Sequence, residues 1–351
     1  MSINEAKLNE FLGKFVNEIG ACAAGANVVL GHRLGLYKAL SQAGAVTSAE
    51  LAKKTEMNER YVREWLSGQA AGGWIEYDAG SEKFSMNAEQ AFMLADESSP
   101  AFVPGAFLLA QAMYVAIPRM EDNFRTGKGL PWGEHHECLF AGTESFFRSS
   151  YIGNLLSGWI PALDGVKEKL ERGAKVADVG CGLGASTIIL AKAFPRSTFI
   201  GIDSHEGSIV TARERARAAG VGDQVKFEVA KSTDFPGDGY DLIANFDCLH
   251  DMEDPVGAAR YARQKLAADG TWMIVEPMAN DSLKDNLNPV GRLFYAASTM
   301  LCVPHSLSQN GPALGAQAGE ARLRDVATKG GFSRFRRASE TPFNMVLEAR
   351  P

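Results

Sequence analysis

The stretch from Lys175 to Asp203 constrains the fold of this chain more than any other. A short β-branched run meets three glycines, and an apolar run of helical composition follows until a proline stops it. A second apolar run then ends in Asp203. This order predicts a strand, a tight turn, a helix and a second strand, which together form a βαβ unit suited to holding a nucleoside. The glycines are Gly180, Gly182 and Gly184.

The chemistry of this unit follows from its residue types. Glycines allow positive φ angles and let a ligand lie against bare backbone, and the helix N-terminus adds free N–H groups. Asp203, at the tip of the second strand, can accept hydrogen bonds from both hydroxyls of a ribose. The spacing is G-x-G-x-G and not the G-x-G-x-x-G of dinucleotide sites, so it favours a ligand without a pyrophosphate over NAD. An ordinary βα turn is the structural alternative.

Composition excludes several classes of protein. The 351 residues suffice for two domains, and the net charge of −6 shows no basic footprint for nucleic acid. Five scattered cysteines without CxxC pairs argue for reduced thiols and a cytoplasmic location. No apolar run approaches the roughly 18 residues that a membrane span requires, so we expect no membrane association.

Residues 1–100 have the pattern of a winged helix. The pattern from Leu8 to Leu40 is largely helical and is expected to be broken near Gly20–Gly25. Thr47 and Glu50 form a capping box that opens one helix, Asn58 caps the next, and two short alternating strands follow. Such a domain either binds DNA or serves dimerisation and covers the substrate. The region holds nine Lys or Arg and thirteen Asp or Glu, a net charge of −4, which disfavours DNA. We therefore expect a homodimer in which DNA binding is unlikely.

Residues 101–170 are expected to form a helical bridge and lid. The segment from Trp132 to Phe140 contains two histidines, two glutamates and a cysteine, which suggests a metal. Adjacent residues point in different directions and no HExxH motif or cysteine pair accompanies them, so we expect no metal site. The aromatic residues of the bridge are expected mainly to pack between domains, with a few reaching the acceptor pocket.

Residues 171–351 alternate strands with helices, which predicts an α/β fold with a doubly wound parallel sheet and an antiparallel hairpin at the C-terminus. Ligands in such folds bind at the carboxyl ends of the strands. The polar groups expected there are Asp178, Asp203, Ser204, Ser232, Thr233, Asn245, Asp247 and Glu276.

With Asp178, the glycine loop reads Asp-x-Gly-x-Gly-x-Gly, which resembles motif I of class I S-adenosylmethionine-dependent methyltransferases. Leu249-His250-Asp251 resembles the catalytic stretch of plant and bacterial small-molecule O-methyltransferases with a winged N-terminal domain. The resemblance covers nearly the whole chain and implies S-adenosyl-L-methionine as cofactor. It implies that Asp178 helps hold the methionyl ammonium and Asp203 the ribose.

The resemblance also implies an adenine contact after the third strand, where Ser232 or Thr233 replaces the family's usual aspartate. Asn245 and Phe246, at the end of the fourth strand, complete the expected cofactor set.

His250 is the candidate general base, since an imidazole near neutral pKa can take a proton from a hydroxyl, and Glu276 is the candidate carboxylate that orients it. A structural histidine at a helix start is the alternative. An insertion at residues 280–316 is well placed to build the acceptor pocket. The substrate-binding candidates are Trp132, His135, Phe146, Tyr151, Asp247, Arg292 and Tyr295.

Three functions remain open from the sequence. The leading hypothesis is methyl transfer to a hydroxyl of a small molecule, with His250 as base. The second is an S-methyltransferase that acts on a thiol or thioether acid. A thioether has no proton to lose, so His250 would then have no role as base. The third is a transcriptional regulator that binds S-adenosylmethionine.

Overall fold

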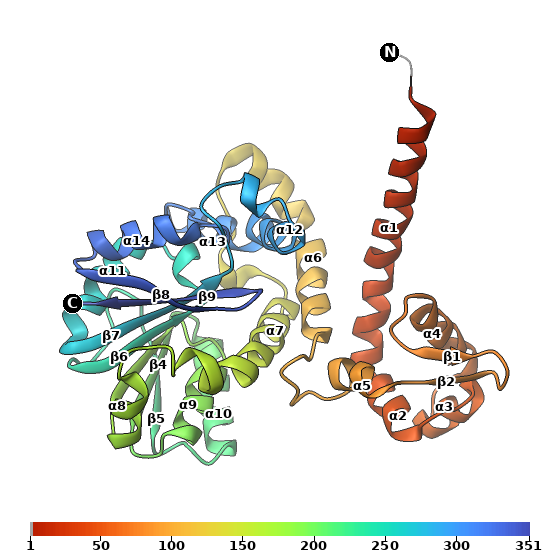
Figure 1. Cartoon of the computed structure of the whole chain (residues 1–351), viewed down its shortest axis with the longest axis horizontal. Helices are drawn as coiled ribbons and strands as arrows, with labels where there is room; N and C mark the ends of the chain where they lie inside the picture. Colours follow the sequence, from red (N-terminus) through yellow and green to blue (C-terminus); the bar gives the residue numbers. More distant parts are fainter. Residues whose placement is uncertain (1–2) are drawn as a thin grey trace. The chain divides into compact units, whose positions relative to one another are not determined.

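The computed structural model describes residues 3–351, which separate into two compact units (Figure 1). The first comprises the described residues up to Ala112 together with Glu137–Ser149, and the second comprises Met113–His136 together with Ser150–Pro351. The region expected as a bridge, 101–170, therefore contributes to both units. No helix within the described residues is long and apolar enough to cross a bilayer.

The first unit contains the predicted winged helix. Thr47 forms the predicted capping box with Glu50 at the start of its third helix, and Asn58 caps the fourth. Two short antiparallel strands form the wing. The elements are α1 (Glu5–Arg33), α2 (Leu36–Ala43), α3 (Ser48–Thr55), α4 (Glu59–Ala71), β1 (Glu76–Asp78), β2 (Lys83–Ser85) and α5 (Ala88–Leu94).

One local expectation for the first unit was wrong. The glycines at 20–25 were expected to break the first helix, but α1 runs through them without interruption. The helix ends instead where Gly35 adopts a left-handed conformation with φ of 68°. A single helical glycine costs only about 1 kcal/mol relative to alanine, which the surrounding residues of a long helix can offset.

Two helices, α6 (Pro104–Thr126) and α7 (Cys138–Asn154), run from one unit into the other. The second unit then continues through short helices to the sheet. These are η1 (Trp132–Glu134), η2 (Leu155–Trp159) and α8 (Val166–Arg172).

The sheet of the second unit confirms the predicted fold class. Within the described residues it has seven strands in the order β5-β4-β3-β6-β7-β9-β8. The first five are parallel, and β9 pairs antiparallel with both β7 and β8. The strands are β3 (Lys175–Val179), β4 (Thr198–Asp203), β5 (Val225–Val229), β6 (Tyr240–Phe246), β7 (Leu266–Pro277), β8 (Arg334–Glu340) and β9 (Asn344–Arg350).

The strand order reverses at β3, because the chain first proceeds to β4 and β5 on one side and then crosses to β6 on the other. In open α/β sheets this switch point creates the crevice at the carboxyl ends of the strands where ligands bind. The helices that connect the strands are α9 (Ala185–Ala193), α10 (Glu206–Ala218), η3 (Leu249–Asp251), α11 (Pro255–Lys265) and α14 (Gly319–Lys329).

The predicted insertion between β7 and α14 folds into a group of short helices (Figure 1). They are η4 (Lys284–Asn286), α12 (Pro289–Ala297), η5 (Ser298–Cys302) and α13 (Val303–Ser308). Prolines at the starts of α12 and α13 suit the first helical turn, where no N–H donor is needed.

Candidate functional site

The glycine loop after β3 has the backbone that the sequence predicts. Gly180, Gly182 and Gly184 adopt φ angles of 83°, 52° and 81°, which L-residues with side chains rarely adopt. The N–H of Gly182 donates to Asp203 Oδ2 and the N–H of His205 donates to Oδ1, each at 2.9 Å. The Asp203 carboxylate at the end of β4 therefore lies directly against the glycine loop.

Asp178 lies under the loop and is 1% exposed. Its Oδ2 accepts hydrogen bonds of 2.6 Å from the hydroxyls of Ser186 and Thr187, which belong to the first turn of α9. Its Oδ1 is buried and accepts no hydrogen bond from the residues the structure describes. Burial raises the pKa of Asp178 to about 6, although the two hydroxyls act to lower it.

These observations test whether the loop fits S-adenosyl-L-methionine. A Cβ built on Gly182 would meet nothing within 4 Å, so the backbone there faces open space. The uncompensated Oδ1 of Asp178 suits a cationic group. Each Asp203 oxygen accepts one backbone N–H and retains a further lone pair for a ribose hydroxyl. The residues present fit the cofactor.

His250 and Glu276 form a buried pair at the neighbouring strand ends. His250 Nδ1 lies 2.5 Å from Glu276 Oε2, and the side chains are 4% and 1% exposed. Glu276 Oε1 also accepts the N–H of Leu249 at 2.9 Å, which fixes the carboxylate against η3. Burial opposes a charged imidazole, but the Glu276 carboxylate and Cys302 outweigh it and raise the pKa of His250 well above its ordinary value.

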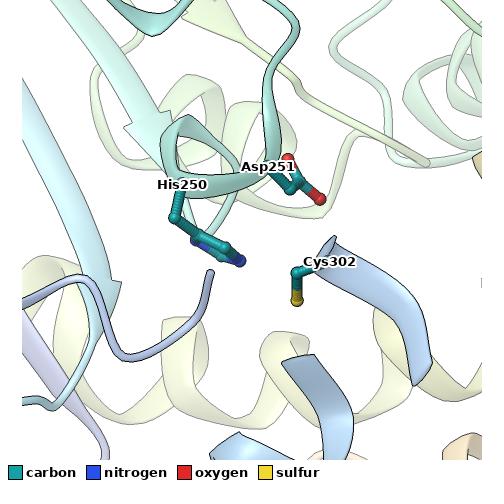
Figure 2. A group of neighbouring side chains, drawn as sticks. All are labelled: His250, Asp251 and Cys302. Carbon is teal, nitrogen blue, oxygen red and sulfur yellow. The ribbon is translucent and has the colours of Figure 1, made fainter. Parts of the chain in front are cut away.

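Two more side chains lie beside the imidazole. Figure 2 shows His250, Asp251 and Cys302 together, with Cys302 carried by the insertion and the other two by η3. One donor atom from each of the three lies within 4.8 Å of the other two. Cys302 did not enter the site predicted from the sequence.

Asp247 joins the site at the end of β6. It has φ of 52°, a conformation that non-glycine residues adopt only where the surroundings enforce it. Its Oδ1 accepts a hydrogen bond of 2.8 Å from Asn344, whereas Oδ2 is buried and has no hydrogen-bond partner within residues 3–351. Burial and the nearby Glu276 carboxylate raise the pKa of Asp247 well above its ordinary value.

The structure places Asn245 and Phe246 inside the sheet. The Asn245 amide donates to the carbonyl oxygen of Val179 at 2.9 Å and accepts from Trp272 Nε1 at 2.8 Å. Both ends of this side chain are therefore engaged in joining β3, β6 and β7. Phe246 is 5% exposed and packs against Tyr151 and Trp159, with ring centroids 5.3 and 6.4 Å apart.

Two acceptor-site candidates, Trp132 and His135, lie in and next to η1. The N–H of Trp132 donates to His305 Nδ1 at 3.0 Å, and a Cβ on Gly133 would lie 3.5 Å from the His205 ring. The η1 segment therefore lies between α13 and the residues that follow β4. His135 is 8% exposed, and burial followed by the charge of His305 lowers its pKa to about 4.

The remaining candidates are more dispersed. Tyr151 is buried beside Phe246, whereas Phe146 belongs to the first unit, where its ring packs against Phe147 at 5.2 Å. On α12, Arg292 is exposed and Tyr295 is partly exposed. After the strand ends, Ser204 is exposed, and Ser232 and Thr233 are partly buried beyond β5.

Sequence reasoning missed His205, His305, Asn344 and Cys302 as neighbours of the site. His205 directly follows the second strand and could have been found by extending the rule of strand ends by two residues. The other three come from the insertion and the hairpin. The insertion was expected at the acceptor pocket, but no local pattern in the sequence indicates which of these side chains reach the site.

Comparison with known proteins agrees with this architecture. Residues 22–96 match the family described as Rv2258c-like winged HTH domain, and residues 170–321 match the family described as Methyltransferase domain. Methyltransferase GfsG of Streptomyces halstedii is 30% identical over 152 residues, which are 43% of this chain and 54% of that protein. The 27-O-demethylrifamycin SV methyltransferase of Amycolatopsis mediterranei is 32% identical over 144 residues, 40% of this chain and 50% of that protein. The chain thus spans about half the length of these two curated relatives.

Solved structures are similar over the whole chain. Human N-acetylserotonin methyltransferase in complex with SAM has a TM-score of 0.72 at 16% identity, covering 100% of this chain and 99% of that one. An O-methyltransferase family protein from Burkholderia thailandensis has a TM-score of 0.70 at 17% identity, covering 100% and 99%. At these identities the likeness establishes the fold. With the two domain matches, it shows that the chain combines an N-terminal winged-helix domain with a methyltransferase domain.

Proposed function

We propose that this protein transfers a methyl group from S-adenosyl-L-methionine to a hydroxyl of a small molecule, with His250 as general base. The observation that carries the proposal is the buried pair of His250 and Glu276, 2.5 Å apart, at the strand ends next to the glycine loop. A histidine that only capped a helix would not need a buried carboxylate against its second nitrogen.

The pair fixes the tautomer of the base. Glu276 accepts the proton on Nδ1, so in the neutral imidazole the lone pair resides on Nε2, the nitrogen that faces Asp251 and Cys302 (Figure 2). An acceptor hydroxyl that donates to Nε2 would lose its proton to His250 as its oxygen bonds to the methyl carbon, and the electron pair of the carbon–sulfur bond that breaks would remain on the sulfur. The Glu276 carboxylate then stabilises the imidazolium that results.

The cofactor residues are proposed from the same crevice. When bound, S-adenosyl-L-methionine supplies a methyl group on a positively charged sulfur. Asp203 holds the ribose hydroxyls, the glycine loop supplies bare backbone, and Asp178 attracts the methionyl ammonium. We propose that Ser204, Ser232 and Thr233 contact the adenosine part of the cofactor. Asn245 and Phe246 are left out of this set because their side chains are engaged within the protein.

The acceptor pocket is proposed to involve Trp132, His135, Tyr151 and Asp247 from the second unit. Asp247 offers an unpaired oxygen, and His135 has two buried ring nitrogens without hydrogen-bond partners in the described chain. Such groups favour a polar acceptor that satisfies them. Arg292 and Tyr295 on α12, and Phe146 on the first unit, are kept as candidates.

The winged helix is proposed to serve dimerisation rather than DNA binding. In α4, Arg60 and Arg63 form ion pairs with Glu64 and Glu59, so their charge is already compensated. In contrast, α1 exposes apolar side chains at helical spacing, which a second copy of this chain would cover. They are Leu8, Phe11, Leu12, Phe15, Val16 and Ile19.

The proposal is tested with radiolabelled-methyl S-adenosyl-L-methionine and a panel of phenols, hydroxy acids, thiols, thioether acids and amines, for wild type and His250→Ala. We expect transfer to a hydroxyl that the variant loses while it still binds cofactor. Transfer to a thioether with little effect of the substitution would contradict the base role and support the S-methyltransferase alternative. Cofactor binding without any transfer, together with a mobility shift of DNA at physiological salt, would support the regulator.

A further inference from the structure

The site contains three side chains whose donor atoms are of the kinds that bind transition metals. His250 offers Nε2, Asp251 a carboxylate oxygen and Cys302 a sulfur, and one donor atom of each lies within 4.8 Å of the others. His250 is 3%, Asp251 9% and Cys302 8% exposed, so the cluster is buried. Figure 2 shows the imidazole edge directed toward the other two side chains.

We propose that His250, Asp251 and Cys302 form a binding site for Zn²⁺. Nitrogen, oxygen and sulfur are the three ligand types that zinc combines in proteins. Mg²⁺ and Ca²⁺ require sets of oxygen ligands that this cluster lacks. A tetrahedral zinc with bonds of about 2.0–2.3 Å would draw the donor atoms closer together than they lie here, which side-chain rotations of Asp251 and Cys302 can provide.

The surroundings of His250 support the proposal independently. Histidine ligands of zinc almost always donate their second ring N–H to a carboxylate or carbonyl, which fixes the tautomer. Glu276 Oε2 already lies 2.5 Å from Nδ1 and is itself held by the N–H of Leu249. Nε2 is thereby left as the nitrogen that can bind a metal.

Charge favours the same ion. Zn²⁺ binding releases to solvent the Cys302 proton and the proton that a charged His250 carries on Nε2, so the ion would be held by one thiolate, one carboxylate and one neutral imidazole. The two positive charges of the ion and the two negative charges of these ligands balance, while Glu276 keeps its hydrogen bond from Nδ1. Three protein ligands leave a fourth coordination position open to solvent or to an acceptor oxygen.

Zinc bound at this site would affect methyl transfer, an expectation that rests on the proposed function. Zinc on Nε2 would take the lone pair that receives the acceptor proton. Zn²⁺ is therefore expected to inhibit methyl transfer without weakening the binding of S-adenosyl-L-methionine.

The binding test does not depend on activity. The full chain is freed of metal with a chelator and titrated with Zn²⁺ by calorimetry, and separately with Co²⁺ to detect the near-ultraviolet absorption of a cobalt–thiolate bond. We expect calorimetry to show one ion bound per chain and the cobalt complex to show a thiolate absorption band. Cys302→Ser should lose this band. The affinity of Cys302→Ser for Zn²⁺ should fall by more than the roughly 10–100-fold that is lost when a group that only orients a metal ligand is removed. Cys22→Ser is the control: it removes an exposed thiol of the first unit, and it should change neither the Zn²⁺ affinity nor the cobalt–thiolate band.

The outcomes separate the two proposals. Binding without a thiolate band, or equal affinity in Cys302→Ser and wild type, would overturn the zinc site whatever the activity. Should Cys302→Ser fail to fold by circular dichroism, Asp251→Asn gives the same affinity test. Where methyl transfer is detected, Zn²⁺ should inhibit wild type and spare Cys302→Ser. Zinc binding without any transfer would leave the metal site standing and the methyltransferase proposal in doubt.

Discussion

Replacing Glu276 with glutamine tests the catalytic proposal at its centre. The substitution preserves shape, and its amide oxygen can still accept the N–H of Leu249. The amide NH₂ would then face His250 Nδ1 and donate to it. This forces the imidazole proton onto Nε2, so the lone pair that should receive the acceptor proton is lost.

The magnitude follows from the distance. His250 Nδ1 and Glu276 Oε2 lie 2.5 Å apart, and both groups are buried. Taking charge centres about 4 Å apart and an effective dielectric constant of about 20, the attraction is about 4 kcal/mol. Because Glu276 is the largest of the groups that raise the pKa of His250 against the effect of burial, its removal should lower that pKa.

The assay is the pH dependence of kcat with the acceptor that the panel identifies. In wild type, the rate should rise with pH through the raised pKa of His250, because only the neutral imidazole can accept a proton. Glu276→Gln should lower kcat by about 10²–10⁴-fold and move the rise to lower pH. Glu348→Gln is the matched control: it changes an equally buried carboxylate, 2% exposed, that pairs with Arg350 on β9.

A kcat within about threefold of wild type, with the pH profile unmoved, would refute the role of Glu276, since a general base and its orienting group together supply at least about 100-fold. A similar loss in Glu348→Gln would point to general destabilisation of the sheet. Circular dichroism melting of both variants distinguishes these cases.

Three further predictions concern the cofactor, the loop and assembly. The affinity for S-adenosyl-L-methionine by calorimetry should fall as pH drops below about 6, where Asp178 becomes neutral, and Asp178→Asn should flatten this dependence; a flat wild-type profile would contradict the ammonium contact. Gly180→Ala should lower the melting temperature more than Gly220→Ala, because both glycines have positive φ but only a Cβ at Gly180 would lie 2.6 Å from the sulfur of Cys248. Equal losses would mean that the loop relaxes. Phe11→Glu with Phe15→Glu should convert a dimer to monomer in light scattering, and an unchanged mass would place the interface elsewhere.

Much of the fold was predictable because its signals are local. The capping box of Thr47 and Glu50, the cap at Asn58 and the strand limits near Tyr240 each depend on a few adjacent residues. Gly20 and Gly25 were wrongly expected to break α1, because the free-energy cost of a glycine inside a helix is small and depends on what surrounds the helix.

The candidate site was likewise predictable only in part. Asp178, Asp203, His250 and Glu276 could be brought together from the sequence because each lies at the end of a parallel strand or, for His250, in the short helix just after one, and such ends meet at one edge of the sheet. Asn245 also ends a strand, but the structure turns its amide to Val179 and Trp272. Which way a side chain points at a strand end depends on the neighbouring strands.

The sequence by itself determined the winged helix, the order of strands and helices, the glycine loop and the pairing of a histidine with an acid. The tertiary structure decided that Cys302 lies beside His250 and that Asn344 holds Asp247. Those contacts join the insertion and the hairpin to the end of β6, segments far apart in the chain. Their meeting depends on how the short helices and the antiparallel strands pack onto the sheet, and packing between distant segments leaves no periodic pattern in the sequence of either one.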